Sequence, residues 1–158
     1  MSKHSDDKRT FPYLRKPWIL ETIFFFVVLW QESFRLSSRT SHKILPLTKR
    51  LQHIYYYNFG DFVNGYVIAF IVDGVSNLFL FKQRESYKLL GFKISTRKNA
   101  FLASLISIFV VAIFELTQST STTSDINDIP AGVLGAILYF FIRLLALKLT
   151  SEYGKASK

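Results

Sequence analysis

Charge in this chain of 158 residues is segregated into blocks, and the long stretches between the blocks carry almost none. Residues 100–116 are the cleanest example, with a single acidic residue, Glu115, near their end. A helix needs about 20 mostly apolar residues to cross a hydrocarbon core roughly 30 Å thick. The basic blocks flank these stretches instead of forming a soluble face. The pattern therefore predicts an integral membrane protein.

The expected fold class is all-α, an integral membrane bundle of about four transmembrane helices. The first span must extend past Trp30 or thin the bilayer, because its interface anchors Trp18 and Trp30 lie only about 18 Å apart along a helix, which is less than the hydrocarbon core of roughly 30 Å. The alternative for this segment is a helix lying in the membrane surface. A short amphipathic helix is also expected after Pro46. The spans cover about residues 17–35, 60–81, 100–116 and 129–149, within a membrane domain 18–149 between a basic tail 1–17 and a short tail 150–158.

The distribution of Lys and Arg predicts the orientation of the four spans. Fifteen of these residues fall on the side that holds the basic tail, the loop 82–98 and the C-terminal end of the chain, in which Arg143 and Lys148 at the end of the fourth span are counted. Five fall on the other side, all in the linker 35–58, and the connection 117–128 has none. Because basic residues accumulate on the cytoplasmic side, both termini are expected there, in a multi-pass protein of the plasma (inner) membrane. If the first segment does not cross, this bias disappears.

Composition excludes several classes of site. The net charge of +9 would suit nucleic acid, but no soluble basic face is present, and membrane lipids are the expected partner. No cysteine occurs, which excludes disulfides, thiolate zinc sites and a cysteine nucleophile. The three histidines have no ligand spacing. We recognise no catalytic constellation, so enzymatic activity is left open, and no cofactor is predicted.

Six polar residues are expected to meet at the outer face of the membrane. Asp61 and Asn64 would begin the second span, and their i, i+3 spacing places them on one helix face. Glu115 and Gln118 would end the third span. Asp125 and Asp128 follow in the next connection. Helix capping by Asp61 and Asp128 is the alternative explanation. Glu115 is harder to explain in this way, because a carboxylate beside an apolar span is costly unless it is paired, protonated or solvated.

Asp73 lies past the midplane of the second span and shares a helix face with Asn77. It is expected either to form a buried hydrogen bond with a neighbouring helix or to act in a proton relay or substrate clamp. Arg143 and Lys148 are expected to extend towards the membrane interface. The fourth span also carries small residues at a spacing of four, which allows close helix packing, either within the bundle or between two copies of the chain. These residues are Ala131, Gly132, Gly135 and Ala136.

At these positions the chain resembles the VanZ-like family of small membrane proteins, named after a teicoplanin-resistance factor. The matching segments are GDFVNGY with Asp61, FELTQ with Glu115 and Gln118, and DINDIPAGVLGA with Asp125, Asp128 and Gly135. Asn64 stands where the family usually has histidine. The resemblance implies a role in the cell envelope and, in one branch, antibiotic resistance. It implies no established reaction.

Three functions follow from these observations. The first is a binding or enzymatic site at the outer face for a polar lipid or lipid-linked envelope molecule. There Glu115, Asp125 and Asp128 would hold a divalent cation, if one binds, through carboxylate oxygens. The second is a non-catalytic scaffold for an envelope complex, for which the small residues of the fourth span would matter. The third is transport, which four spans without internal repeats do not favour unless the chain forms oligomers.

Overall fold

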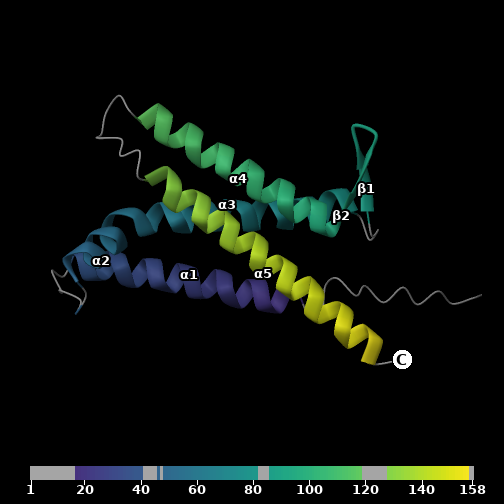
Figure 1. Cartoon of the computed structure of the whole chain (residues 1–158), viewed down its shortest axis with the longest axis horizontal. Coiled ribbons are helices and arrows are strands. Elements are labelled where there is room, and N and C mark those ends of the chain that lie inside the picture. Colours follow the sequence, from purple (N-terminus) through teal and green to yellow (C-terminus); the bar gives the residue numbers. More distant parts are fainter. Residues whose placement is uncertain (1–16, 41–45, 47, 82–85, 119–127, 157–158) are drawn as a thin grey trace, which may run out of the picture.

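The computed structural model describes residues 17–40, 46, 48–81, 86–118 and 128–156. Four long helices dominate this part of the chain, and a small two-stranded hairpin joins two of them (Figure 1). The elements in order are α1 (Pro17–Thr40), α2 (Lys49–His53), η1 (Ile54–Asn58), α3 (Phe59–Ser76), η2 (Asn77–Phe81), β1 (Ser86–Leu89), β2 (Phe92–Ser95), α4 (Thr96–Gln118) and α5 (Asp128–Ala156).

The predicted helical membrane bundle is confirmed. Within the described ranges, three helices are long and apolar enough to span a membrane: Lys49–Phe79, Thr96–Thr117 and Asp128–Leu149. The helix α1 is not one of these three, but its 24 residues continue ten residues past Trp30. Figure 1 shows it running alongside α3, so it is the fourth member of the bundle.

The second of these helices differs from the expected span. The short helix expected after Pro46 is present as α2, but it continues through η1 into α3 without a break. The end of the expected basic linker is therefore the first part of a long helix. A bend at η1, whose backbone has π-helical hydrogen bonding, turns α2 away from the line of α3 (Figure 1).

The hairpin between η2 and α4 was not predicted. Its strands pair antiparallel, with Leu89 opposite Phe92 and Lys88 opposite Lys93. The two turn residues both have positive φ, 49° at Leu90 and 85° at Gly91. This is the backbone that a two-residue hairpin turn requires.

Large apolar side chains cover the outside of the bundle. Phe26, Phe109 and Phe141, on three different helices, are each at least 61% exposed. The buried residues include many small and polar ones, among them Ala69, Ala100, Ala136, Ser104 and Ser107. This distribution suits a protein whose surroundings are lipid, since small residues let helices approach and large apolar ones face the acyl chains.

The helices α3 and α5 form the most extensive contact in the bundle. A Cβ atom built on Gly65 would lie 1.9 Å from the carbonyl oxygen of Gly132, and one built on Gly135 would lie 1.9 Å from that of Phe62. Only glycine permits this approach of the two backbones. Gly132, Gly135 and Ala136 are buried and Ala131 is half-buried, so the small residues of α5 pack within the chain. Ser107 of α4 adds a hydrogen bond of 2.6 Å to the carbonyl oxygen of Gly65.

Candidate functional site

The bundle has two polar regions, and the first lies at the end where α1 and α4 finish and α3 and α5 begin. Asp61, Glu115 and Asp128 reach this end from three different helices, and their carboxylates repel one another electrostatically. These are three of the six residues predicted to converge. We call them the acidic rim.

The other three predicted residues are not shown to join the acidic rim. Asn64 is exposed on α3. Gln118 is the last residue of α4, and Asp125 lies outside the described residues. Within the described part of the chain, no group of three or more histidine or acidic side chains is arranged to hold a metal ion. The predicted cation site therefore remains a prediction that depends on Asp125.

One hydrogen bond and one nearby cation connect the acidic rim to neighbouring elements. Asn58, the last residue of η1, donates a hydrogen bond of 2.8 Å from Nδ2 to Oδ1 of Asp128. Arg35 of α1 donates to both carboxylate oxygens of Glu32, at 2.8 and 2.6 Å, and to the carbonyl oxygen of Tyr56. It also lies close enough to Asp61 to attract its charge. The end of α1 is thereby tied to η1 beside the rim.

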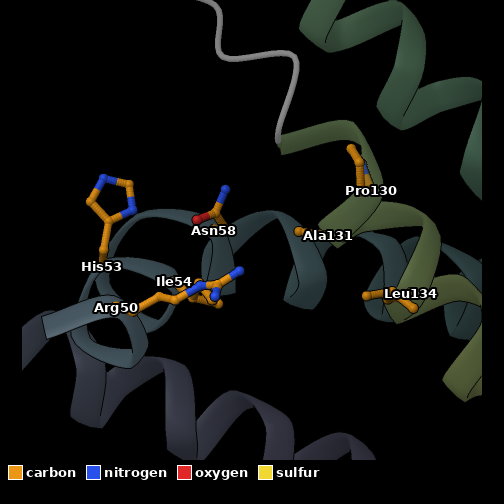
Figure 2. A pocket seen from close by; sticks show the side chains of 7 residues that line it. All are labelled: Arg50, His53, Ile54, Asn58, Pro130, Ala131 and Leu134. Atoms are coloured by element: carbon orange, nitrogen blue, oxygen red, sulfur yellow. The ribbon is translucent and has the colours of Figure 1, made fainter. Parts of the chain in front are cut away.

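A groove lies next to the acidic rim, between α2–η1 and the first turns of α5 (Figure 2). The groove has a volume of about 500 Å³. Figure 2 shows Arg50 and His53 on one wall, with the guanidinium of Arg50 reaching into the space between the two helices. The lining residues are Arg50, His53, Ile54, Asn58, Pro130, Ala131 and Leu134.

An apolar pocket of about 330 Å³ continues this groove. The two share Ile54, Asn58, Ala131 and Leu134, so they form one surface with a basic part and an apolar part. The apolar part is completed by Leu51, Tyr55, Phe59 and Phe62. We call the combined surface the amphipathic groove. Aromatic and basic side chains continue beside it, where the ring of Tyr57 lies 4.7 Å from that of His53 and 5.6 Å from the guanidinium carbon of Arg39.

The second polar region lies inside the bundle, towards the opposite end. Nη1 of Arg143 donates to both carboxylate oxygens of Glu21, at 2.8 and 3.0 Å. Its Nε lies 3.0 Å from Oδ2 of Asp73, an ion pair without hydrogen-bond geometry. Asp73 also accepts hydrogen bonds from Tyr139, at 2.6 Å, and from Asn99. We call these five residues the buried cluster, to which each of the four long helices contributes.

The buried cluster corrects one expectation and resolves another. Arg143 was expected to extend to the membrane interface, but its side chain is 1% exposed. It stays inside because the carboxyl groups of Glu21 and Asp73, on two neighbouring helices, contact its guanidinium group. Asp73 forms the buried bonds to neighbouring helices that were one of its two predicted roles. Glu21 and Asn99 were not predicted to belong to any site. One signal in the sequence could have indicated the pair, because Glu21 is an acid near the start of one apolar segment and Arg143 is a base near the end of another.

Comparison with protein-family models, curated proteins and solved structures found no match to this chain. The resemblance to the VanZ-like family therefore has only the residues quoted above to support it. What is shown is a helical bundle with three helices long and apolar enough to span a membrane.

Proposed function

We propose that this membrane protein binds a polar lipid, with a phosphate in its headgroup, in the amphipathic groove beside the acidic rim. The observation that carries the proposal is the composition of the groove. One continuous surface joins the exposed cationic side chain of Arg50 and the imidazole of His53 to a wall of apolar side chains. A phospholipid likewise joins an anionic headgroup to apolar acyl chains, so its two parts match the basic and the apolar part of the groove.

The charges around the groove support this ligand chemistry. An arginine guanidinium binds phosphate through paired N–H donors, and it does so more strongly where water is partly excluded. Asp128 lies two residues before Pro130 of the groove and is bonded to Asn58 in its lining. A headgroup that also carries an amine would therefore find carboxylates next to its phosphate site.

The distribution of charge favours an outer-leaflet position for this groove. The hairpin and the start of α4, at the other end of the bundle, carry Lys88, Lys93, Arg97 and Lys98. The positive-inside rule assigns such an end to the cytoplasm. Both termini would then be cytoplasmic, and the groove would face envelope lipids or lipid-linked envelope molecules. A role in the envelope, with antibiotic sensitivity as its phenotype, would follow from the VanZ-like resemblance.

Lipid binding can be tested with purified protein in nanodiscs or by native mass spectrometry. Arg50→Gln should weaken binding of an aminophospholipid about tenfold or more, since a hydrogen bond to a charged group contributes about 1.5–3 kcal/mol. Arg97→Gln, which removes an exposed arginine at the opposite end, is the matched control and should leave binding unchanged. An uncharged glycolipid should bind weakly to both proteins. Equal binding by the two variants would exclude the groove as the phosphate site.

A non-catalytic scaffold remains the alternative function. The small-residue face of α5, which a scaffold would have used to bind a partner, already packs within the chain. Gly132 contacts Val111, and Gly135 contacts the backbone of α3. A scaffold would have to use another surface. Replacing Leu134 by Gln separates the two functions, since it should weaken lipid binding in the groove while leaving any co-purifying complex intact.

A further inference from the structure

The buried cluster contains two carboxyl groups and only one cation. The side chains of Glu21, Asp73 and Arg143 are each at most 2% exposed. Arg35, the other buried arginine of the described residues, pairs with Glu32 at the opposite end of the bundle. If both carboxyl groups were ionised, the cluster would hold one uncompensated negative charge away from water. Such a charge is strongly unfavourable in a bundle surrounded by lipid.

The hydrogen bonds show which of the two carboxyl groups is built to be charged. Asp73 accepts from Asn99 at one oxygen and from Tyr139 at the other, which also faces the guanidinium of Arg143. Donors at both oxygens stabilise a carboxylate. Within the described residues, Glu21 receives hydrogen bonds from Arg143 alone, through a single nitrogen.

The charges that face Glu21 favour the same assignment. From α5 it faces Arg143 and Tyr139, and from α3 it faces Asp73 and Tyr66. Asp73 is a like charge, and neither tyrosine supplies a positive one. Arg143 is therefore the single cation shared by Glu21 and Asp73, and Asp73 has the additional donors.

We propose that the buried cluster is a proton-binding site in which Glu21 holds the proton while Arg143 and Asp73 form a fixed ion pair. The bound proton completes the charge balance, because a neutral carboxyl, a carboxylate and a guanidinium sum to zero. Its release to water leaves the carboxylate of Glu21 to compete with Asp73 for Arg143. This inference is independent of the lipid groove, since the two sites share no residue.

Infrared spectroscopy of the intact protein tests this assignment directly. A protonated carboxyl group has a C=O stretch that a carboxylate lacks, and ¹³C-labelled glutamate or aspartate shows which residue type gives it. At neutral pH the band should shift with glutamate labelling and not with aspartate labelling, and it should disappear in Glu21→Gln. Asp73→Asn should also lose the band, because Glu21 then ionises as the only acidic partner of Arg143 in the cluster. Glu115→Gln, in the acidic rim, is the control and should retain the band. A band that shifts with aspartate labelling, or no band that depends on Glu21, would overturn the proposal.

A second inference comes from the hairpin, which has one apolar and one basic face. Leu89 and Phe92 are paired and exposed by 44% and 73%, and Leu90 at the tip is 91% exposed. On the same face as Leu89 and Phe92, Ile94 is buried at the base of the hairpin. The apolar face thus continues from the packed bundle out to the tip.

The basic face of the hairpin carries two like charges directly opposite each other. Lys88 and Lys93 are cross-strand partners and both are exposed. This pairing destabilises an isolated hairpin unless anions lie nearby. Leu90 adds a left-handed backbone conformation that an apolar residue rarely adopts. These features serve no packing within the described chain.

The surroundings of the hairpin identify what it contacts. It joins two helices that are long enough to span a membrane, so its base lies at the membrane boundary. Figure 1 shows it standing out from the bundle, across the direction of the helices. We infer that the hairpin lies in the lipid interface, with Leu89, Leu90 and Phe92 in the acyl region and the two lysines on lipid phosphates.

Spin labelling can test this position, because the chain has no native cysteine. A label on Leu90→Cys, in liposomes with anionic lipid, should collide more with oxygen than with a water-soluble nickel complex. The control label on Arg97→Cys, at an exposed position in the first turn of α4, should show the reverse. Equal access of the nickel complex to both labels would place the tip in water. Protection of position 90 from both reagents would indicate a protein contact instead. Either result would overturn the inference.

Discussion

Asp61 and Asp73 lie on the same helix, α3, in opposite electrostatic surroundings. Asp61 belongs to the acidic rim, where the nearest charged groups include Asp128 and Glu115. Asp73 belongs to the buried cluster, where an arginine, a tyrosine and an asparagine surround it. Like charges are tolerated at the end of the bundle, while a carboxylate inside it is fully paired.

This contrast separates two uses of acidic residues in a membrane bundle. Carboxylates at the rim lie close enough to repel one another, and this repulsion costs stability. The interior carboxylate of Asp73 accepts hydrogen bonds from α4 and α5, so it connects these helices to α3. The predictions below use matched substitutions in the two regions to test this difference.

Replacing Arg143 with Met should have the largest effect on stability. It leaves Glu21 and Asp73 buried without a cation, which costs about 3–5 kcal/mol. Unfolding in detergent measures the loss. Lys148→Met, five residues later and exposed, is the control and should change stability by less than about 0.5 kcal/mol. A small effect at Arg143 would show that the cluster does not stabilise the bundle.

Adding Glu21→Gln and Asp73→Asn to Arg143→Met should restore much of the lost stability. The triple variant has no charge left in the buried cluster, and replacement of a whole buried ionic group by neutral residues often changes stability little. A triple variant as unstable as Arg143→Met alone would show that packing, not charge, caused the loss.

Two buried tyrosines provide the next comparison. Tyr139 donates to Asp73, whereas the hydroxyl of Tyr66 has no hydrogen-bond partner among the described residues. Their rings touch edge to face, with centroids 5.6 Å apart. Tyr139→Phe should cost about 1.5–3 kcal/mol, the contribution of a hydrogen bond to a charged group. Tyr66→Phe should be neutral or slightly stabilising. Equal effects would mean that the bond to Asp73 adds nothing beyond packing.

The contact between Gly65 and Gly132 lies between the two regions and should affect both. Gly65→Ala places a methyl group against the backbone of α5, so the helices must separate at a cost of about 1–3 kcal/mol. Gly60→Ala is the control and should cost less, because a Cβ atom there would lie 3.1 Å from the side chain of Arg35, whereas one on Gly65 would lie 1.9 Å from a backbone oxygen. Lipid binding should also weaken in Gly65→Ala, since the groove depends on the position of α5. Unchanged stability in Gly65→Ala would contradict the close contact.

Much of this arrangement follows from the sequence by topology alone. Alternating spans place Asp61, Glu115 and Asp128 at one end, whatever the details of packing. Pairing inside the bundle cannot be found in this way. Glu21 and Arg143 are 122 residues apart, and each is an isolated charge in its own segment. Their contact depends on how far each helix is rotated about its axis, and hydrophobic periodicity defines this rotation poorly when all faces of a helix are apolar.

The hairpin and the groove escaped prediction for related reasons. The many charges of the loop 82–98 obscure an alternation of apolar and polar residues, in which the apolar positions are Tyr87, Leu89, Phe92 and Ile94. Arg50 and His53 were assigned to a linker, and only the continuous helix from α2 to α3 brings them against α5. The small residues of α5 were found from their spacing, but their partner Gly65 lies on another helix. Local patterns thus identify surfaces, and tertiary structure decides which surfaces meet.

The same substitution at the two aspartates of α3 gives the smallest effect and the sharpest comparison. Asp61→Asn removes a like charge from the acidic rim and should stabilise the protein by about 0.2–0.5 kcal/mol, the usual size of such interactions near a helix surface. Asp73→Asn removes a paired charge and should destabilise it. Thermal unfolding of the two variants in the same detergent compares them, with added salt reducing only the Asp61 effect, since that site is partly exposed. Two changes of the same sign would mean that depth in the bundle, and not the partners of each carboxylate, governs its contribution.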